Sequence, residues 1–230
     1  MLDHFSSLDW QPLLLSLKLA LVTTFCLFVV GLPLAWWLAF GQRRFTLWVD
    51  ALVALPLVLP PTVLGFYLLI ILGPAGPVGW FWLQITDQSL SFSFAGLVIA
   101  SCCYSLPFVV QPLRDSFASM GREPMAVAAS LGANGLDRFM TVALPIAYRG
   151  VLTAGVLGFA HTLGEFGVVL MVGGNIPGET RVVSIAIYDH VETLDYSQAH
   201  LLSIVLLLLS FAMLVPVYAL NGTEKREGAG

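Results

Sequence analysis

Long uncharged stretches alternate with short polar segments along this chain. The uncharged stretches cover residues 19–42, 51–86, 88–113 and 196–223. Residues 150–178 are also apolar, apart from His161 and Glu165. A membrane-spanning helix needs roughly 20 mainly apolar residues. The pattern therefore predicts five membrane-spanning helices, near residues 15–40, 49–72, 92–112, 148–172 and 198–220.

The stretch 51–86 is too long for one helix. Three glycines and two prolines within residues 73–79 end a helix there. The aromatic run that follows, Trp80 to Trp82, is predicted to lie along the membrane interface, where amphipathic rings are favoured. A short re-entrant sixth segment is the alternative.

Composition supports a membrane protein. Hydrophobic residues make up 58% of the chain and charged residues 10%, which is too few charges to cover a water-soluble surface. No repeat or soluble domain is evident, so residues 1–230 are predicted to form one all-α integral membrane domain.

Cys26, Cys102 and Cys103 lack metal-ligand spacing and are expected to be free buried thiols. We expect no metal site, no cofactor and no nucleic-acid partner.

The charges are unevenly distributed between the two sides of a five-span chain. Segments 41–48, 113–149 and 221–230 fall on one side and carry eight of the ten basic residues, namely Arg43, Arg44, Arg114, Arg122, Arg138, Arg149, Lys225 and Arg226. Lys18 and Arg181 fall on the other side. By the positive-inside rule, the N-terminus is predicted to lie outside and the C-terminus in the cytoplasm.

The loop 113–147 on the basic side contains a short apolar helix. Pro124 suits the first turn of a helix, and Gly132 supplies its end. Small side chains make this helix thin enough to enter a cleft, with Met125 and Leu131 as apolar contacts. A second short helix is predicted from Leu136 to Leu144, ending at Pro145. The alternative is an amphipathic helix that rests on lipid headgroups.

The same loop resembles a known motif. The run that ends at Gly132, with Val142, Leu144 and Pro145 about ten residues further on, is similar to the EAA loop of ABC-importer permeases. Aligned on Gly132, the glutamate of that motif falls on Ala126, and Glu123 lies one turn earlier. The resemblance implies a coupling helix that docks on a cytoplasmic ATPase through Met125, Ala126, Val127, Ala128, Ala129, Ser130, Leu131, Gly132 and Ala133.

Three further stretches, Leu55–Gly65, Gly164–Gly167 and Asn175–Arg181, look like the permease subunit of molybdate importers, with sulfate and tungstate permeases as close relatives. The resemblance implies an importer of a tetrahedral oxyanion in a bacterial inner membrane. Its partners would be a cytoplasmic ATP-binding subunit, an external oxyanion-binding protein and a second copy of this chain. The sequence lacks a Walker-type phosphate loop, so it is not expected to hydrolyse ATP itself. The alternative is a stand-alone secondary carrier or membrane enzyme.

Two groups of residues are candidates for the translocation path. Pro60, Pro61 and Thr62 lie in the second predicted span, with Pro60 about 17 Å from its basic end. Broken helices at such a depth occur against protein or a water-filled path. Either a structural kink or a pathway lining fits this pattern, or both.

The second group is His161 and Glu165, which are four residues apart on one face of the fourth predicted span. Intramembrane ionisable groups face a bundle interior or a cavity and have a partner. Glu165 is predicted to pair with His161 or with another subunit, in an orienting or gating role. Proton chemistry and a position at the lipid interface are the alternatives.

Overall fold

The computed structural model describes residues 9–41 and 43–222, and every regular element in them is helical. Lys225 and Arg226, predicted to lie on the basic side, are outside the described residues. The elements are α2 (Gln11–Phe40), α3 (Arg43–Val58), α4 (Pro61–Leu72), α5 (Pro77–Thr86), α6 (Phe94–Met120), α7 (Glu123–Ser130), α8 (Gly135–Arg138), the π-helix η1 (Phe139–Ala143), α9 (Leu144–Ile146), α10 (Tyr148–Leu163), α11 (Gly167–Gly173), α12 (Val183–Glu192) and α13 (Tyr196–Gly222).

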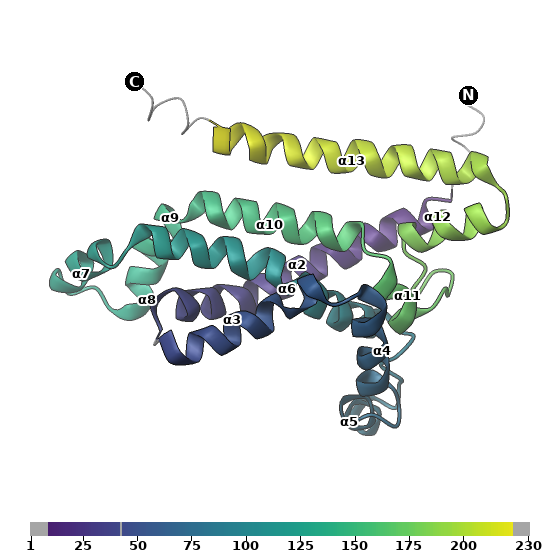
Figure 1. Cartoon of the computed structure of the whole chain (residues 1–230), viewed down its shortest axis with the longest axis horizontal. Helices are drawn as coiled ribbons and strands as arrows, with labels where there is room; N and C mark the ends of the chain where they lie inside the picture. Colours follow the sequence, from purple (N-terminus) through teal and green to yellow (C-terminus); the bar gives the residue numbers. More distant parts are fainter. Residues whose placement is uncertain (1–8, 42, 223–230) are drawn as a thin grey trace.

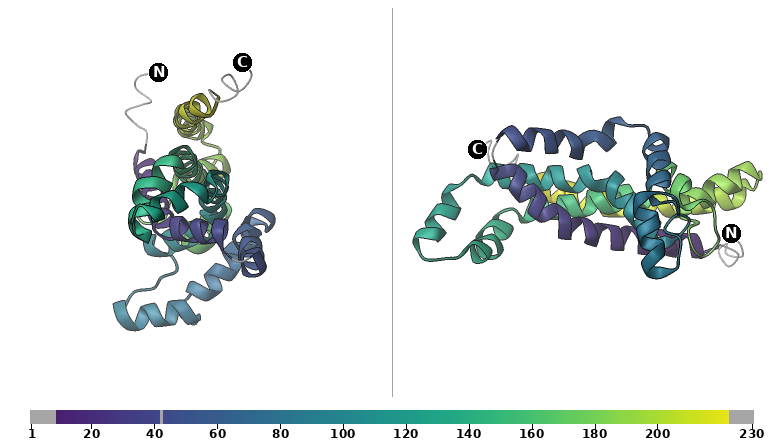
Figure 2. Two further views of the ribbon diagram at one scale, coloured as in Figure 1. Left: turned by 90° about the vertical axis from the view of Figure 1, so that its left-hand side faces the viewer. Right: turned by 90° about the horizontal axis from the view of Figure 1, so that it is seen from below.

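Helices α2, α6 and α10 pack side by side as the centre of the bundle, and α13 lies along its outer side (Figure 1). Glycines allow close approach, because Gly155 faces the ring of Phe28 and Gly158 faces Val109. Helices α4 and α5 project to one side, while α7 lies at the far end (Figures 1 and 2). The long helices therefore leave both ends of the bundle to short, irregular elements.

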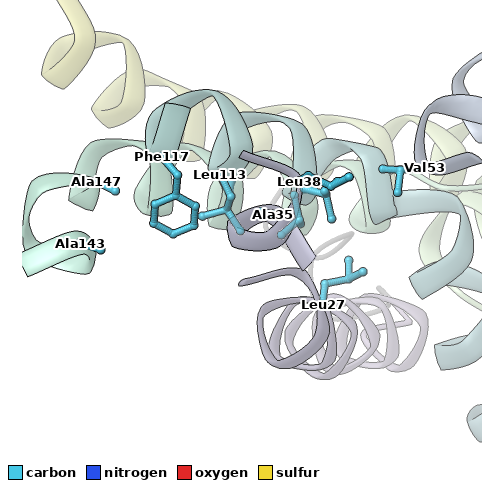
Figure 3. Packing of buried hydrophobic residues seen from close by; sticks show 11 residues of the cluster. Leu27, Ala35, Leu38, Val53, Leu113, Phe117, Ala143 and Ala147 are labelled. Carbon is cyan, nitrogen blue, oxygen red and sulfur yellow. The ribbon is translucent and has the colours of Figure 1, made fainter. Parts of the chain in front are cut away.

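The main apolar core lies near the α7 end. Leu113 and Phe117 of α6 pack with Ala35 and Leu38 of α2, and Val53 of α3 closes the cluster (Figure 3). Ala143 and Ala147, from the segment between α7 and α10, are fully buried against the same cluster. The segment that follows α7 is thus anchored to the bundle.

Three helices are long and apolar enough to cross a membrane: α2, α6 and the described part of α13. The number rises to five if each of two bent pairs counts as one span. The predicted spans 15–40, 92–112 and 198–220 correspond to these three helices. The predicted span 49–72 is not one continuous helix, because the helix axis bends by 112° between α3 and α4, at Leu59 and Pro60. The predicted span 148–172 is interrupted too, at residues 164–166.

Candidate coupling and translocation sites

The exposed helix α7 forms where the sequence predicts it. Pro124 occupies its first turn, and none of its residues is buried. At its end, Gly132 N–H donates to Ala129 O (3.0 Å) and Ala133 N–H to Ala128 O (3.1 Å). These two bonds form a Schellman cap, which needs a left-handed residue between them. Gly132 provides it, with a φ of +89°.

Gly132 therefore ends the helix, as the sequence predicts. A Cβ at this position would meet nothing within 4 Å in this chain, so space inside the chain does not demand glycine. The positive φ does, because a side chain in that conformation is strained.

The side chains of α7 divide into two faces. Val127 is 61% exposed and Leu131 is 83% exposed, so both face away from the bundle, and Ala126, Ala129 and Ser130 are exposed as well. Met125, predicted to contact a partner, instead packs against the core of its own chain. The outward surface is therefore made of small side chains and two aliphatic ones.

The connection from α7 to α10 contains an aromatic cluster. The Trp36 ring packs edge-on against Phe117 and Phe139, with centroids 5.2 and 5.3 Å away. The predicted helix from Leu136 to Leu144 is present but passes through the π-helical turn η1, and it continues past Pro145 to Ile146. Its axis then bends by 77° into α10.

Two polar contacts tie this end of the bundle together. Arg122, which precedes α7, donates from Nη2 to Phe40 O at the end of α2 (2.8 Å). Arg114 of α6 forms an ion pair with Asp50 of α3 (2.8 Å). Arg114 also donates from Nε and Nη2 to the adjacent Asp115 (3.1 and 2.8 Å). The contacts with Phe40 and Asp50 leave no signal in the sequence, since each joins residues far apart along the chain or relies on a backbone carbonyl.

At the other end, the two helix breaks lie against each other. Pro60 caps α4 with an extended backbone, and Pro61 starts the helix. Gly167, the first residue of α11, approaches Pro61 closely, and Gly65 of α4 approaches Met171 and Val168 of α11. Thr62 is exposed. Discontinuous helices that meet inside a bundle are typical of transport sites.

Glu165 lies in the break between α10 and α11 and is 4% exposed. Neither carboxylate oxygen has a hydrogen-bond partner among the described residues. Only its backbone is held, because Ser184 Oγ donates to Glu165 O (2.5 Å). In this arrangement the side chain is enclosed by its own chain, and the predicted pairing with another subunit stays a prediction.

His161 does not pair with Glu165, which corrects the other prediction. Its Nδ1 lies 2.8 Å from Ser105 Oγ, and its ring stacks on Phe108 with centroids 3.8 Å apart. Ser105 also bonds Thr162 Oγ1 (2.9 Å). The pair fails because α10 ends at Leu163, so Glu165 is no longer one helical turn from His161. Ser105 thus forms hydrogen bonds that join α6 to α10.

The loop 175–181 caps the end of α11. Thr180 Oγ1 donates to Gly173 O (2.7 Å), and Arg181 bonds Asn175 and forms an ion pair with Asp189 of α12 (3.3 Å). Within residues 9–41 and 43–222, no three His, Cys, Asp or Glu residues gather as a metal site. The polar groups at this end therefore organise the fold around the helix breaks.

An all-helical membrane bundle with an exposed connecting helix and two opposed helix breaks has the architecture of a transport subunit. This chain belongs to the family of inner membrane components of binding-protein-dependent transport systems, whose sequence profile matches residues 31–222. It is 54% identical to the molybdenum transport permease ModB of Azotobacter vinelandii, over 92% of this chain and 93% of that protein.

More distant relatives agree with this family. The ModB permease of Escherichia coli K12 is 32% identical, over 96% of this chain and 97% of that protein. A probable sulfate permease of Nephroselmis olivacea is 32% identical, over 97% of this chain and 80% of that protein. A chain of the MetNI methionine ABC transporter, solved in inward-facing conformations, shares the fold with a TM-score of 0.71 at 16% identity, over 96% of this chain and 97% of the other.

Proposed function

We propose that this chain is the membrane-spanning subunit of an ATP-driven importer of molybdate. The observation that carries the proposal is the 54% identity to a molybdenum transport permease over nearly the whole chain. Sulfate is the second candidate substrate, supported by the 32% identity to a probable sulfate permease. Tungstate is a tetrahedral oxyanion like molybdate and is the third.

The importer works with partners. An external binding protein delivers the oxyanion, in keeping with the family, and a separate cytoplasmic subunit hydrolyses ATP. Two copies of this chain form the pathway between them, each seated on one ATPase. The family description also favours this account over a stand-alone secondary carrier.

The α7 end of the bundle faces the cytoplasm. Arg114, Arg122, Arg138 and Arg149 all lie in or beside the loop that contains α7, which agrees with the positive-inside rule. The exposed side chains of α7 then face the ATPase. The opposite end, with the α10–α11 break and the loop 175–181, faces the binding protein.

Coupling follows from the packing. ATP-driven closure of the two ATPases moves both copies of α7 together. The aromatic contacts of Phe139 and the buried Ala143 and Ala147 transmit that movement to α10. At the far end of α10, Glu165 and the contact between Pro61 and Gly167 form the gate that responds, and His161 anchors α10 to α6.

The test uses the complex of this chain with its ATPase and binding protein, reconstituted in lipid vesicles. ATP hydrolysis is measured with molybdate, tungstate and sulfate in turn. We expect molybdate to stimulate hydrolysis at the lowest concentration. Stimulation by sulfate alone would make the chain a sulfate permease, and uptake without any ATP dependence would make it a secondary carrier.

A further inference from the structure

Two hollows meet at Trp36, on the α7 end of the bundle. The first has a volume of about 270 Å³ and is lined by Trp36, Phe40, Arg122, Met125, Ala126 and Arg138. The second has a volume of about 400 Å³ and is lined by Pro33, Trp36, Gly135, Leu136 and Phe139. The first hollow is cationic and the second is apolar, so together they suit a molecule with an anionic end and a hydrocarbon end.

The two arginines have donors to spare. Arg122 uses Nη2 on Phe40 O, and Arg138 uses Nε on Asn134 O. Both acceptors are neutral carbonyls, and within the described part of the chain no carboxylate forms an ion pair with either guanidinium. Two guanidinium groups that share one hollow repel each other, and an anion between them would relieve this repulsion. Ala126 also lines this hollow and brings no charge to it.

The apolar hollow has the walls that a hydrocarbon chain requires. Trp36 is fixed by edge-on contacts with Phe40 and Phe139, so its indole forms a rigid partition between the two hollows. Leu136 is 73% exposed, which leaves an aliphatic surface uncovered beside Pro33. Trp36 itself is half-buried, and an exposed leucine beside such a tryptophan and basic side chains is typical of the membrane interface.

We propose that this double hollow binds an anionic phospholipid of the cytoplasmic leaflet, with its phosphate between Arg122 and Arg138 and an acyl chain against Pro33, Leu136 and Phe139. Basic pockets between helices on the cytoplasmic side bind anionic headgroups in general. The proposal rests on the proposed orientation, with the α7 end in the cytoplasm. The lipid bridges α2 to both ends of the α7–α8 segment, so it stabilises the base of the coupling helix.

The test measures lipid binding by native mass spectrometry on the detergent-purified complex of this chain with its ATPase. Phosphatidylglycerol, phosphatidylcholine and inorganic phosphate are added separately. We expect phosphatidylglycerol to bind, and Arg122→Gln or Arg138→Gln to weaken it roughly fivefold each, since a basic side chain at an anionic surface contributes about 1 kcal/mol. Leu136→Asn should weaken lipid binding without changing the response to phosphate. Arg181→Gln, at the opposite end, is the matched charge-removal control and should bind normally.

The outcomes separate this proposal from its rivals. Equal binding of phosphatidylcholine, or unchanged phosphatidylglycerol binding in both arginine variants, would overturn the lipid site. If those variants instead release the ATPase while lipid binding is unchanged, the hollow receives an acidic side chain of the partner and the proposal is wrong. The importer proposal is tested independently, because oxyanion-stimulated ATP hydrolysis can persist in either case.

Discussion

Gly167 lies against Pro61 so closely that a Cβ built on the glycine would be 2.8 Å from the proline Cβ. These residues begin α11 and α4, the two helices that follow the two breaks in the bundle. The contact joins segments about a hundred residues apart in the chain. Packing of α11 on α4 limits the angle between α3 and α4, since Pro60 and Pro61 alone would permit a range of bends.

The first prediction concerns this contact. Gly167→Ala should force α4 away from α11, because the proline ring has no flexible end that can move aside. Overpacking of this kind costs about 1–3 kcal/mol. The measurement is the unfolding temperature of the detergent-purified complex, together with its molybdate uptake.

Gly164→Ala provides the matched control. A Cβ at Gly164 meets no heavy atom nearer than 3.7 Å, and its backbone φ is −91°. This variant should keep both the unfolding temperature and uptake. If the two alanine variants behave alike, the close contact between the breaks has no part in stability or gating.

The second prediction concerns Glu165. A buried carboxylate without a hydrogen-bond partner is costly, so Glu165→Gln should leave the unfolding temperature unchanged or raise it. If the charge serves gating, the same variant should transport molybdate more slowly while it retains its full complement of ATPase. Glu179→Gln, on the exposed loop 175–181, is the control for the unfolding temperature, which it should leave unchanged.

A fall in unfolding temperature with normal uptake would contradict the gating role. It would mean that the Glu165 carboxylate forms a stabilising contact in the assembled protein. Separate measurements of stability, ATPase content and uptake are needed, because a defect in uptake alone does not distinguish gating from assembly.

The third prediction concerns orientation. A cysteine at Glu123, beside Arg122, should react with a membrane-impermeant maleimide only when the cytoplasmic face is accessible. A cysteine at Glu179 should react from outside. Labelling of both positions from one side, or with the two sides exchanged, would contradict the five-span arrangement and the assignment of α7 to the cytoplasm.

Much of the fold follows from the sequence pattern. Uncharged length was sufficient to predict α2 and α6, and the small residues between Pro124 and Gly132 predicted α7. The length of the uncharged stretches could not reveal the two breaks. The prolines at 60 and 61 marked the first break but not its 112° bend, next to which Pro61 packs against Gly167 of α11. The second break, at residues 164–166, contains no proline.

The candidate site was harder to predict, because it depends on tertiary contacts. The spacing of His161 and Glu165 is that of one helical turn, but the helix ends between them and His161 bonds Ser105 instead. Gly132 was correctly predicted to end α7, and its positive φ supplies the physical reason. Arg122 bonds a carbonyl of α2, and a backbone acceptor leaves no sequence signal.

The last prediction concerns α7 itself. Ala129 is exposed on this helix, so Ala129→Trp should fold normally while it blocks close packing of an ATPase over the helix. Gly132→Trp, which should also remain inserted, is less informative because it strains the cap of the helix as well. Ala75→Trp, an equally exposed substitution in the loop between α4 and α5, is the control.

The most direct test of the account is to measure ATP hydrolysis and molybdate uptake together, in vesicles that contain the complex and its binding protein. Wild type and Ala75→Trp should show ATP-dependent uptake. Ala129→Trp should insert and remain stable, yet lose its ATPase or hydrolyse ATP without uptake. Normal coupled uptake by Ala129→Trp would mean that α7 is only an interfacial helix and would contradict the proposal that it couples ATP hydrolysis to transport.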